Sequence, residues 1–224
     1  MSHDITFHPI AADELQRFVF EVLLDPGIAE SRAAEVTEDP EKRRALIELY
    51  EQLHGVEQDV ILGKEPFATL SLGIAGVAGF LHPYWYVRGA AVSFLAELDE
   101  EGFGPFLVSL RTLTPRRYRG VDDKAPGRIR ENFAGGGLIE HRKLPGLQQR
   151  LIDDDEGSPV GEVFDAESLE CLEAAVDYAI AHKCGLIEAS ELVMPSEDEA
   201  FTDIDNLRAW HLGNVDDETN ARQA

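Results

Sequence analysis

Apolar residues recur every three to four positions through the first quarter of the chain, which is the spacing of amphipathic helices. Three helices are predicted there. One begins at Asp13 and ends before the turn 25–27, a second covers 28–36, and a third covers 41–63. The third is the most regular, and Gly63 is a typical C-terminal stop. Its apolar positions are Leu46, Leu49, Tyr50, Leu53, Val56 and Val60.

The longest apolar run, 66–87, contains no formally charged residue. It approaches the length of a membrane-spanning helix, but Pro83 and three polar aromatic residues close it. A buried core helix or hairpin is therefore predicted instead. The glycines at 73, 76 and 79 favour a helix, in which they form one smooth stripe; the alternative is short strands that bend at each glycine.

Patterns typical of strands are few, so the predicted fold class is α+β, predominantly helical with a small sheet, with all-α as the alternative. A short strand is expected over 5–7, and strict alternation predicts another over 106–113. The remaining predictions are helices over 90–98, 138–152 and 165–183, the last beginning at an N-cap Asp165, and a strand or helix over 186–193.

The length and the apolar content of the chain predict a single globular domain over 1–195. A loop over about 114–137 interrupts it, because prolines, glycines and basic residues replace the apolar periodicity there. The segment 196–224 holds eight acids and two arginines, which predicts an acidic, partly disordered tail.

Charge is distributed unevenly along this chain, whose net charge is −23. The stretch 111–150 contains ten of the twenty basic residues and only four acids, so the rest of the chain is more acidic than the total suggests. Charge of this size governs association rate and choice of partner more than fold. The basic residues are Arg111, Arg116, Arg117, Arg119, Lys124, Arg128, Arg130, Arg142, Lys143 and Arg150.

Two interpretations of the basic stretch remain open. In the first, its cations form ion pairs with the protein's own acids and neutralise part of their charge. In the second, they hold an anionic ligand, because guanidinium groups bind phosphates and carboxylates well. Nucleic acid is not expected as a partner, since the acidic remainder would repel it. The anion-binding candidates are Arg116, Arg117, Arg119, Arg128 and Arg130.

No catalytic residue is predicted, because the chain has no nucleophile elbow, phosphate-binding loop or dinucleotide fingerprint. No metal or cofactor is predicted either. Glu51 and His54 form a single Glu-x-x-His pattern without the second copy that di-iron bundles require. Near the C-terminal end of the helix over 165–183, His182 and Cys184 fit a helix-dipole contact and a structural thiol better than a metal site.

These observations lead to one functional hypothesis, a non-enzymatic, soluble, cytoplasmic, acidic protein that binds a basic protein partner, as inhibitors of basic nucleases or immunity proteins do. The alternative is an enzyme or binding protein for an anionic small molecule held by 111–150, with His82 or His141 as the proton-transfer group. No membrane association is expected, and the two cysteines are expected to be reduced. The partner-binding candidates are Glu48, Glu51, Glu57, Tyr84, Trp85 and Tyr86.

Overall fold

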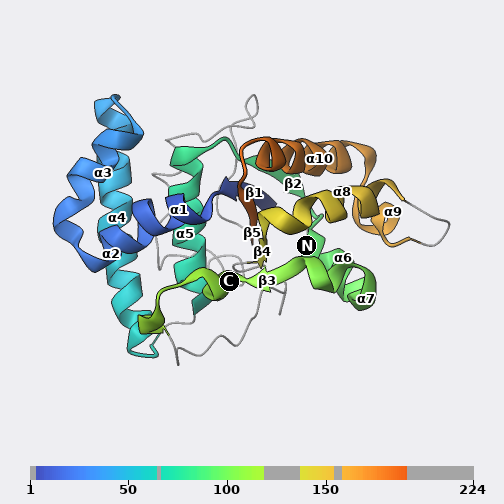
Figure 1. Cartoon of the computed structure of the whole chain (residues 1–224), viewed down its shortest axis with the longest axis horizontal. Helices are drawn as coiled ribbons and strands as arrows, with labels where there is room; N and C mark the ends of the chain where they lie inside the picture. The colour runs from blue at the N-terminus through green and yellow to red at the C-terminus, as the bar shows by residue number, and fades with distance from the viewer. Residues whose placement is uncertain (1–3, 65–66, 119–136, 154–157, 191–224) are drawn as a thin grey trace, which may run out of the picture.

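The computed structural model describes residues 4–64, 67–118, 137–153 and 158–190. An antiparallel sheet lies between two layers of helices, with the helices of the N-terminal part on one face and those of the C-terminal part on the other (Figure 1). The predicted fold class, a predominantly helical α+β protein, is confirmed. The basic loop, apart from its ends, and the acidic tail lie outside the described residues.

The sheet has five strands in the order β2-β1-β5-β4-β3, and every neighbouring pair is antiparallel. The N-terminal strand β1 is near the centre because it pairs with β2 on one side and with β5 on the other. The strands are β1 (Asp4–Ile10), β2 (Trp85–Arg88), β3 (Leu107–Ser109), β4 (Gly137–Ile139) and β5 (Gly185–Ser190).

The first helical layer is built around α5, the apolar run of the sequence. This helix packs between α4 and β1, so both of its sides are covered by protein and it needs no polar face. In the described residues no helix is long and apolar enough to cross a membrane. The layer consists of α1 (Ala12–Leu15), a π-helical turn (Gln16–Phe20), α2 (Glu21–Leu24), α3 (Ala29–Val36), α4 (Pro40–Ile61) and α5 (Phe67–Leu81).

The second layer covers the opposite face of the sheet, and its longest helix, α10, packs on β1, β2, β5 and α8. Asp165 begins α10 as predicted, because its side chain accepts a hydrogen bond from the Ser168 backbone N–H at 2.8 Å. The layer consists of α6 (Val92–Leu98), α7 (Glu100–Phe103), α8 (Leu144–Ile152), α9 (Val160–Val163) and α10 (Ala166–Ala181).

Side chains of β1 alternate between the two faces of the sheet, and each face has its own hydrophobic core. The first core lies under the first helical layer and the second core under the second layer. Ile5 and Phe7 face the second layer, whereas Ile10 faces the first. His8 is fully buried on the first-layer face, where its Nε2 lies 2.8 Å from Thr6 Oγ1 and its ring stacks on Tyr84 with centroids 4.9 Å apart. Burial lowers the pKa of His8 to about 3, so this histidine is a neutral core residue.

Local signals placed most elements correctly, but two predictions were wrong. The segment 138–152 is not one helix, since Leu138 and Ile139 belong to the short strand β4 and α8 begins only at Leu144. The segment 106–113 is not one strand, since β3 covers only Leu107–Ser109 and Leu110–Leu113 is a 3-10 helix. Gly185 is the first residue of β5, and a Cβ there would lie 3.0 Å from the Ile139 carbonyl oxygen, so glycine allows β5 to approach β4.

Candidate functional site

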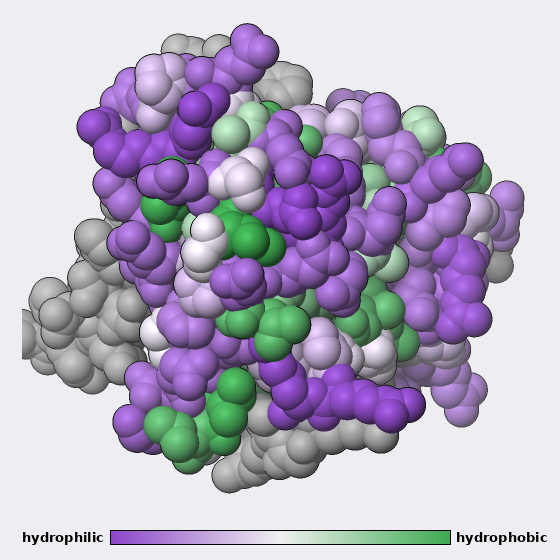
Figure 2. Space-filling model, turned by 60° about the vertical axis from the view of Figure 1, so that its left-hand side comes forward, coloured by the Kyte–Doolittle hydropathy of each residue, from purple (hydrophilic) through white to green (hydrophobic). Residues whose placement is uncertain are grey.

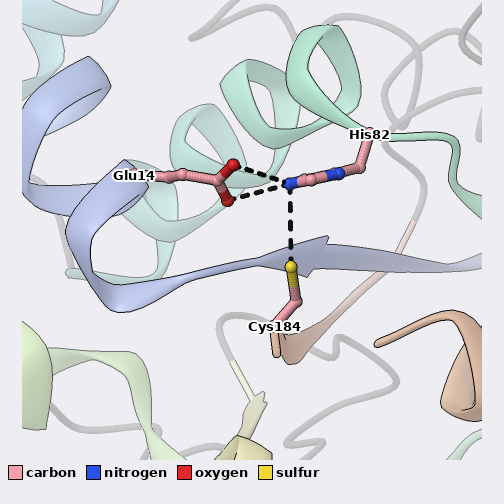
Figure 3. Close-up of side chains that lie close together, drawn as sticks. All are labelled: Glu14, His82 and Cys184. Carbon is pink, nitrogen blue, oxygen red and sulfur yellow. Dashed lines mark hydrogen bonds and ion pairs between the residues drawn. The ribbon is translucent and has the colours of Figure 1, made fainter. Parts of the chain in front are cut away.

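Three side chains from distant parts of the sequence come together at the end of the sheet where β1 ends and β5 begins. Glu14 lies on α1, His82 follows α5, and Cys184 directly precedes β5. Figure 3 shows the carboxylate and the sulfur both directed at the same nitrogen of the His82 ring. Their donor atoms all lie within 4.8 Å of one another. We call these three residues the Glu-His-Cys cluster.

The geometry of the cluster centres on His82 Nε2. The two carboxylate oxygens of Glu14 lie 3.0 and 2.8 Å from this nitrogen, and Cys184 Sγ lies 3.6 Å from it. The His82 side chain is 13% exposed and that of Glu14 is 27% exposed, whereas Cys184 is buried. The cluster is therefore at the edge of the core, with its histidine and carboxylate reaching solvent.

The end of α10 determines where Cys184 lies. Lys183 adopts the left-handed conformation (φ 59°), its N–H donates to the Ile180 carbonyl, and the Cys184 N–H donates to the Ala179 carbonyl at 2.8 Å. This pair of hydrogen bonds is a Schellman motif, which reverses the chain at the end of a helix. The reversal brings Cys184 back toward β5 and the first layer.

The other two members of the cluster are held by neighbouring groups. Glu14 Oε2 accepts a hydrogen bond from the Ala11 backbone N–H at 2.8 Å, which ties the carboxylate to the start of α1. His82 Nδ1 lies 3.2 Å from the Tyr178 hydroxyl of α10. The ring of Tyr178 in turn stacks on His182, with centroids 3.8 Å apart. Tyr178 thus orients His82 from the side opposite Glu14.

The protonation states follow from these contacts. The hydrogen bond from His82 holds the pKa of Glu14 below its ordinary value, so Glu14 is a carboxylate at neutral pH. Burial, reinforced by the charges of Glu14 and Asp13, raises the pKa of Cys184 to about 12. The sulfur is therefore a protonated thiol, which is a poor nucleophile.

The arrangement differs from a nucleophilic triad. In a triad the nucleophile and the acid contact opposite nitrogens of the histidine, so that the acid orients the ring that takes the nucleophile's proton. Here Glu14 and Cys184 both face Nε2, and Tyr178 is the group at Nδ1. One carboxylate oxygen, one imidazole nitrogen and one sulfur within 4.8 Å of one another are a donor set that could hold a metal ion.

The sequence-predicted anion-binding residues do not form a site in the described part of the chain. Arg117 Nη2 lies 2.6 Å from a carboxylate oxygen of Glu57, so this arginine is engaged internally. Arg116 is exposed, and Arg119, Arg128 and Arg130 lie outside the described residues. Arg150 also pairs internally, with Asp99 at 3.3 Å. Arg117 and Arg150 therefore pair with the protein's own acids, as in the first interpretation of the basic stretch.

The predicted partner-binding residues divide into exposed and buried groups. Glu48 and Glu51 are exposed on α4, and Trp85 and Tyr86 are half-buried. Tyr84 is fully buried. Glu57 does not share their exposure, because it is 1% exposed and accepts a hydrogen bond from the Tyr118 hydroxyl. It falls on the apolar stripe of α4, one turn beyond Leu53, and that spacing was the signal that it faces the core.

Sequence reasoning considered His82 and Cys184 separately and did not single out Glu14. The cluster joins positions 68 and 102 residues apart, and no motif links such positions in a chain read by itself. A polar histidine directly after the longest apolar helix was the one local signal available, because such a residue lies at the edge of the core.

In comparisons with known proteins, no protein family, curated protein or solved structure matches the chain.

Proposed function

We propose that the protein binds a basic protein partner, and that the second helical layer is the surface that meets it. The observation that carries this proposal is the charge of that layer. Helices α6–α10 and their N-cap residues hold ten acids and two cations, Lys143 and Arg150. Eight of the ten acids are exposed and two are half-buried. They are Glu97, Asp99, Glu100, Glu101, Glu162, Asp165, Glu167, Glu170, Glu173 and Asp177.

The two cations of this layer are too few to neutralise its ten acids. Lys143 lies 3.8 Å from Glu140, which precedes α8, and Arg150 pairs with the half-buried Asp99. The longest helix, α10, contains four acids and no lysine or arginine. A surface with one sign of charge raises the rate at which an oppositely charged protein associates by roughly 10- to 1,000-fold at low salt.

The first layer differs in that its acids and cations are interspersed. Arg17 and Arg32 both pair with Glu35, at 2.5 and 2.8 Å, and Lys64 pairs with Asp59 at 3.0 Å. Figure 2 shows the side of the molecule on which this layer lies, with hydrophilic residues over most of it and separate hydrophobic patches between them. This mixture of charges makes the first layer the weaker attractor for a basic protein.

The alternative function, binding of an anionic small molecule, gains no support from the described residues. Of its five proposed arginines, Arg117 is engaged by the buried carboxylate of Glu57. We therefore retain only the partner-binding proposal.

Two variants with the same change in net charge test the proposal. The second-layer variant carries Glu97→Gln, Glu162→Gln, Glu167→Gln and Glu170→Gln, and the first-layer control carries Glu30→Gln, Glu38→Gln, Glu48→Gln and Glu51→Gln. All eight residues are exposed. Affinity capture from the cell lysate at low salt, with elution by a salt gradient, identifies the basic partner. Association rates of that partner with the three proteins are then measured by stopped-flow mixing.

The second-layer variant is expected to associate about 10-fold more slowly than the original protein, and the control only about 2-fold more slowly. The rate of the original protein should fall steeply as salt is added, because exposed charges are screened beyond about 10 Å at 0.1 M. Equal rates for the two variants, a rate insensitive to salt, or a failure to retain any basic protein would each contradict the proposal.

A further inference from the structure

The Glu-His-Cys cluster supports an inference that is independent of the acidic surface. Its three side chains offer one oxygen, one nitrogen and one sulfur, which are the donor types that zinc takes from proteins. Calcium and magnesium prefer oxygen ligands alone, so a sulfur and an imidazole nitrogen select against them. The chemistry of the donors therefore indicates a borderline transition metal.

We propose that Glu14, His82 and Cys184 bind one divalent metal ion of the zinc class, with water in the fourth coordination position. Three protein ligands and one open position are the arrangement of zinc sites that act on a water molecule or a substrate. The exposed fractions of Glu14 and His82 give the ion a path from solvent.

One of the donor spacings equals that of such an ion, and a second requires a small movement of the carboxylate. A tetrahedral zinc with ordinary bond lengths holds its sulfur and nitrogen ligands about 3.6 Å apart. Cys184 Sγ and His82 Nε2 are 3.6 Å apart. The same geometry places a carboxylate oxygen about 3.4 Å from the nitrogen, whereas Glu14 lies 2.8 Å away in a hydrogen bond. The carboxylate would retreat by about half an ångström as the ion replaces the shared proton.

The neighbours of the cluster match what metal ligands require. The Tyr178 hydroxyl at His82 Nδ1 fixes the ring with Nε2 toward the Glu14 carboxylate (Figure 3). The Ala11 N–H holds the Glu14 carboxylate. Such contacts orient ligands before the metal arrives, and their removal typically lowers metal affinity by about 10- to 100-fold. Metal binding replaces the proton of the Cys184 thiol, because the thiolate is the form that coordinates.

His182 provides a matched control for adventitious binding to surface histidines. It is exposed, its ring centroid lies 6.4 Å from that of His82, and its Nδ1 lies 2.8 Å from the Tyr178 carbonyl oxygen. The proposal places it outside the ligand set. His182→Ala therefore removes the nearest other imidazole and leaves the three ligands in place.

The test uses the full chain after treatment with a chelator. Zn²⁺ is titrated against a chromogenic competitor for the original protein and for Glu14→Gln, His82→Gln, Cys184→Ser, Tyr178→Phe and His182→Ala, with circular dichroism as the check of folding. We expect one equivalent bound. We expect losses of affinity above about 100-fold for the three ligand variants and of roughly 10-fold for Tyr178→Phe. His182→Ala should retain the original affinity.

Cobalt gives a second readout, because the spectrum of the original protein does not depend on how the variants fold. Co²⁺ bound to the original protein should show a thiolate-to-cobalt charge-transfer band in the near ultraviolet, and Cys184→Ser should lack it. Binding of less than one equivalent, a cobalt spectrum without that band, or equal loss of affinity in His182→Ala and His82→Gln would overturn the proposal. None of these outcomes bears on the salt-dependent association of the acidic surface.

Discussion

Replacing Arg117 by alanine is expected to lower the free energy of unfolding by about 3–5 kcal/mol, which is the usual cost of leaving one member of a buried ion pair alone. The Glu57 carboxylate is 1% exposed and lies 2.6 Å from Arg117 Nη2. Tyr118 donates its hydroxyl to the same carboxylate, and its ring packs against Phe20 and Phe67 in the first core. Without Arg117, the carboxylate keeps only the Tyr118 hydroxyl and the more distant His54, whose Nδ1 lies 3.7 Å from Glu57 Oε2.

Urea denaturation at neutral pH measures the effect, and Arg116→Ala is the matched control. Arg116 is the preceding residue and is exposed, so its removal should change stability by less than about 0.5 kcal/mol. The double variant Glu57→Gln with Arg117→Ala should recover most of the loss, because the buried charge is then absent. A loss below about 1 kcal/mol for Arg117→Ala would contradict this account of the first core.

Glu188→Ala is expected to cost about 3–5 kcal/mol, because it leaves buried donors without an acceptor. Glu188 is 1% exposed on β5 and caps the start of α6. Its Oε2 accepts from the Val92 N–H at 2.7 Å and from the Ser93 N–H at 3.3 Å, and its Oε1 accepts from the Ser93 hydroxyl. The carboxylate therefore joins the sheet to the second helical layer.

Glu188→Gln is the informative companion and should change stability by less than about 1.5 kcal/mol. The amide oxygen can replace Oε2 as acceptor for the two backbone N–H groups, and the amide nitrogen can donate to Ser93 Oγ. Equal losses for the alanine and glutamine variants, measured by urea denaturation, would show that Glu188 acts through its charge and not through its hydrogen bonds.

The difference in stability between the original protein and Glu188→Gln should depend on pH, and its direction can be predicted. Burial raises the pKa of Glu188 above its ordinary value of 4.5, so between that value and the raised pKa the folded state binds more protons than the unfolded state. The contribution of this residue to stability therefore falls as pH rises through that window, by at most about 1.4 kcal/mol per pH unit. The difference in unfolding free energy between the original protein and Glu188→Gln should show this fall, and a difference independent of pH would contradict it.

Local information was sufficient for the elements whose signals lie close together in the chain. Gly63 was predicted as the stop of α4 and lies just beyond its C-terminal end, because a helix cap involves only the adjacent turn. The apolar run became the core helix α5, because a helix without a polar face must be covered on all sides. The fold class could be predicted because long helical patterns outnumber strand patterns along the chain.

Tertiary structure decided everything that depends on pairing between distant residues. β4 is three residues long, too short for alternation to be visible, and only its pairing with β3 and β5 defines it. The charge of Glu57 predicted an exposed residue, but its position on the apolar stripe of α4 places it in the core, where Arg117 compensates it.

The candidate site shows the same limit. Glu14, His82 and Cys184 lie on three separate elements, and each is unremarkable in its own sequence context. The Schellman turn at Lys183 and the packing of α1, α5 and β5 bring them together. The sequence by itself determined the helices, the net charge and its uneven distribution along the chain. Only the folded chain determined which charges remain exposed and which donors meet, because burial and proximity are properties of packing and not of neighbouring positions.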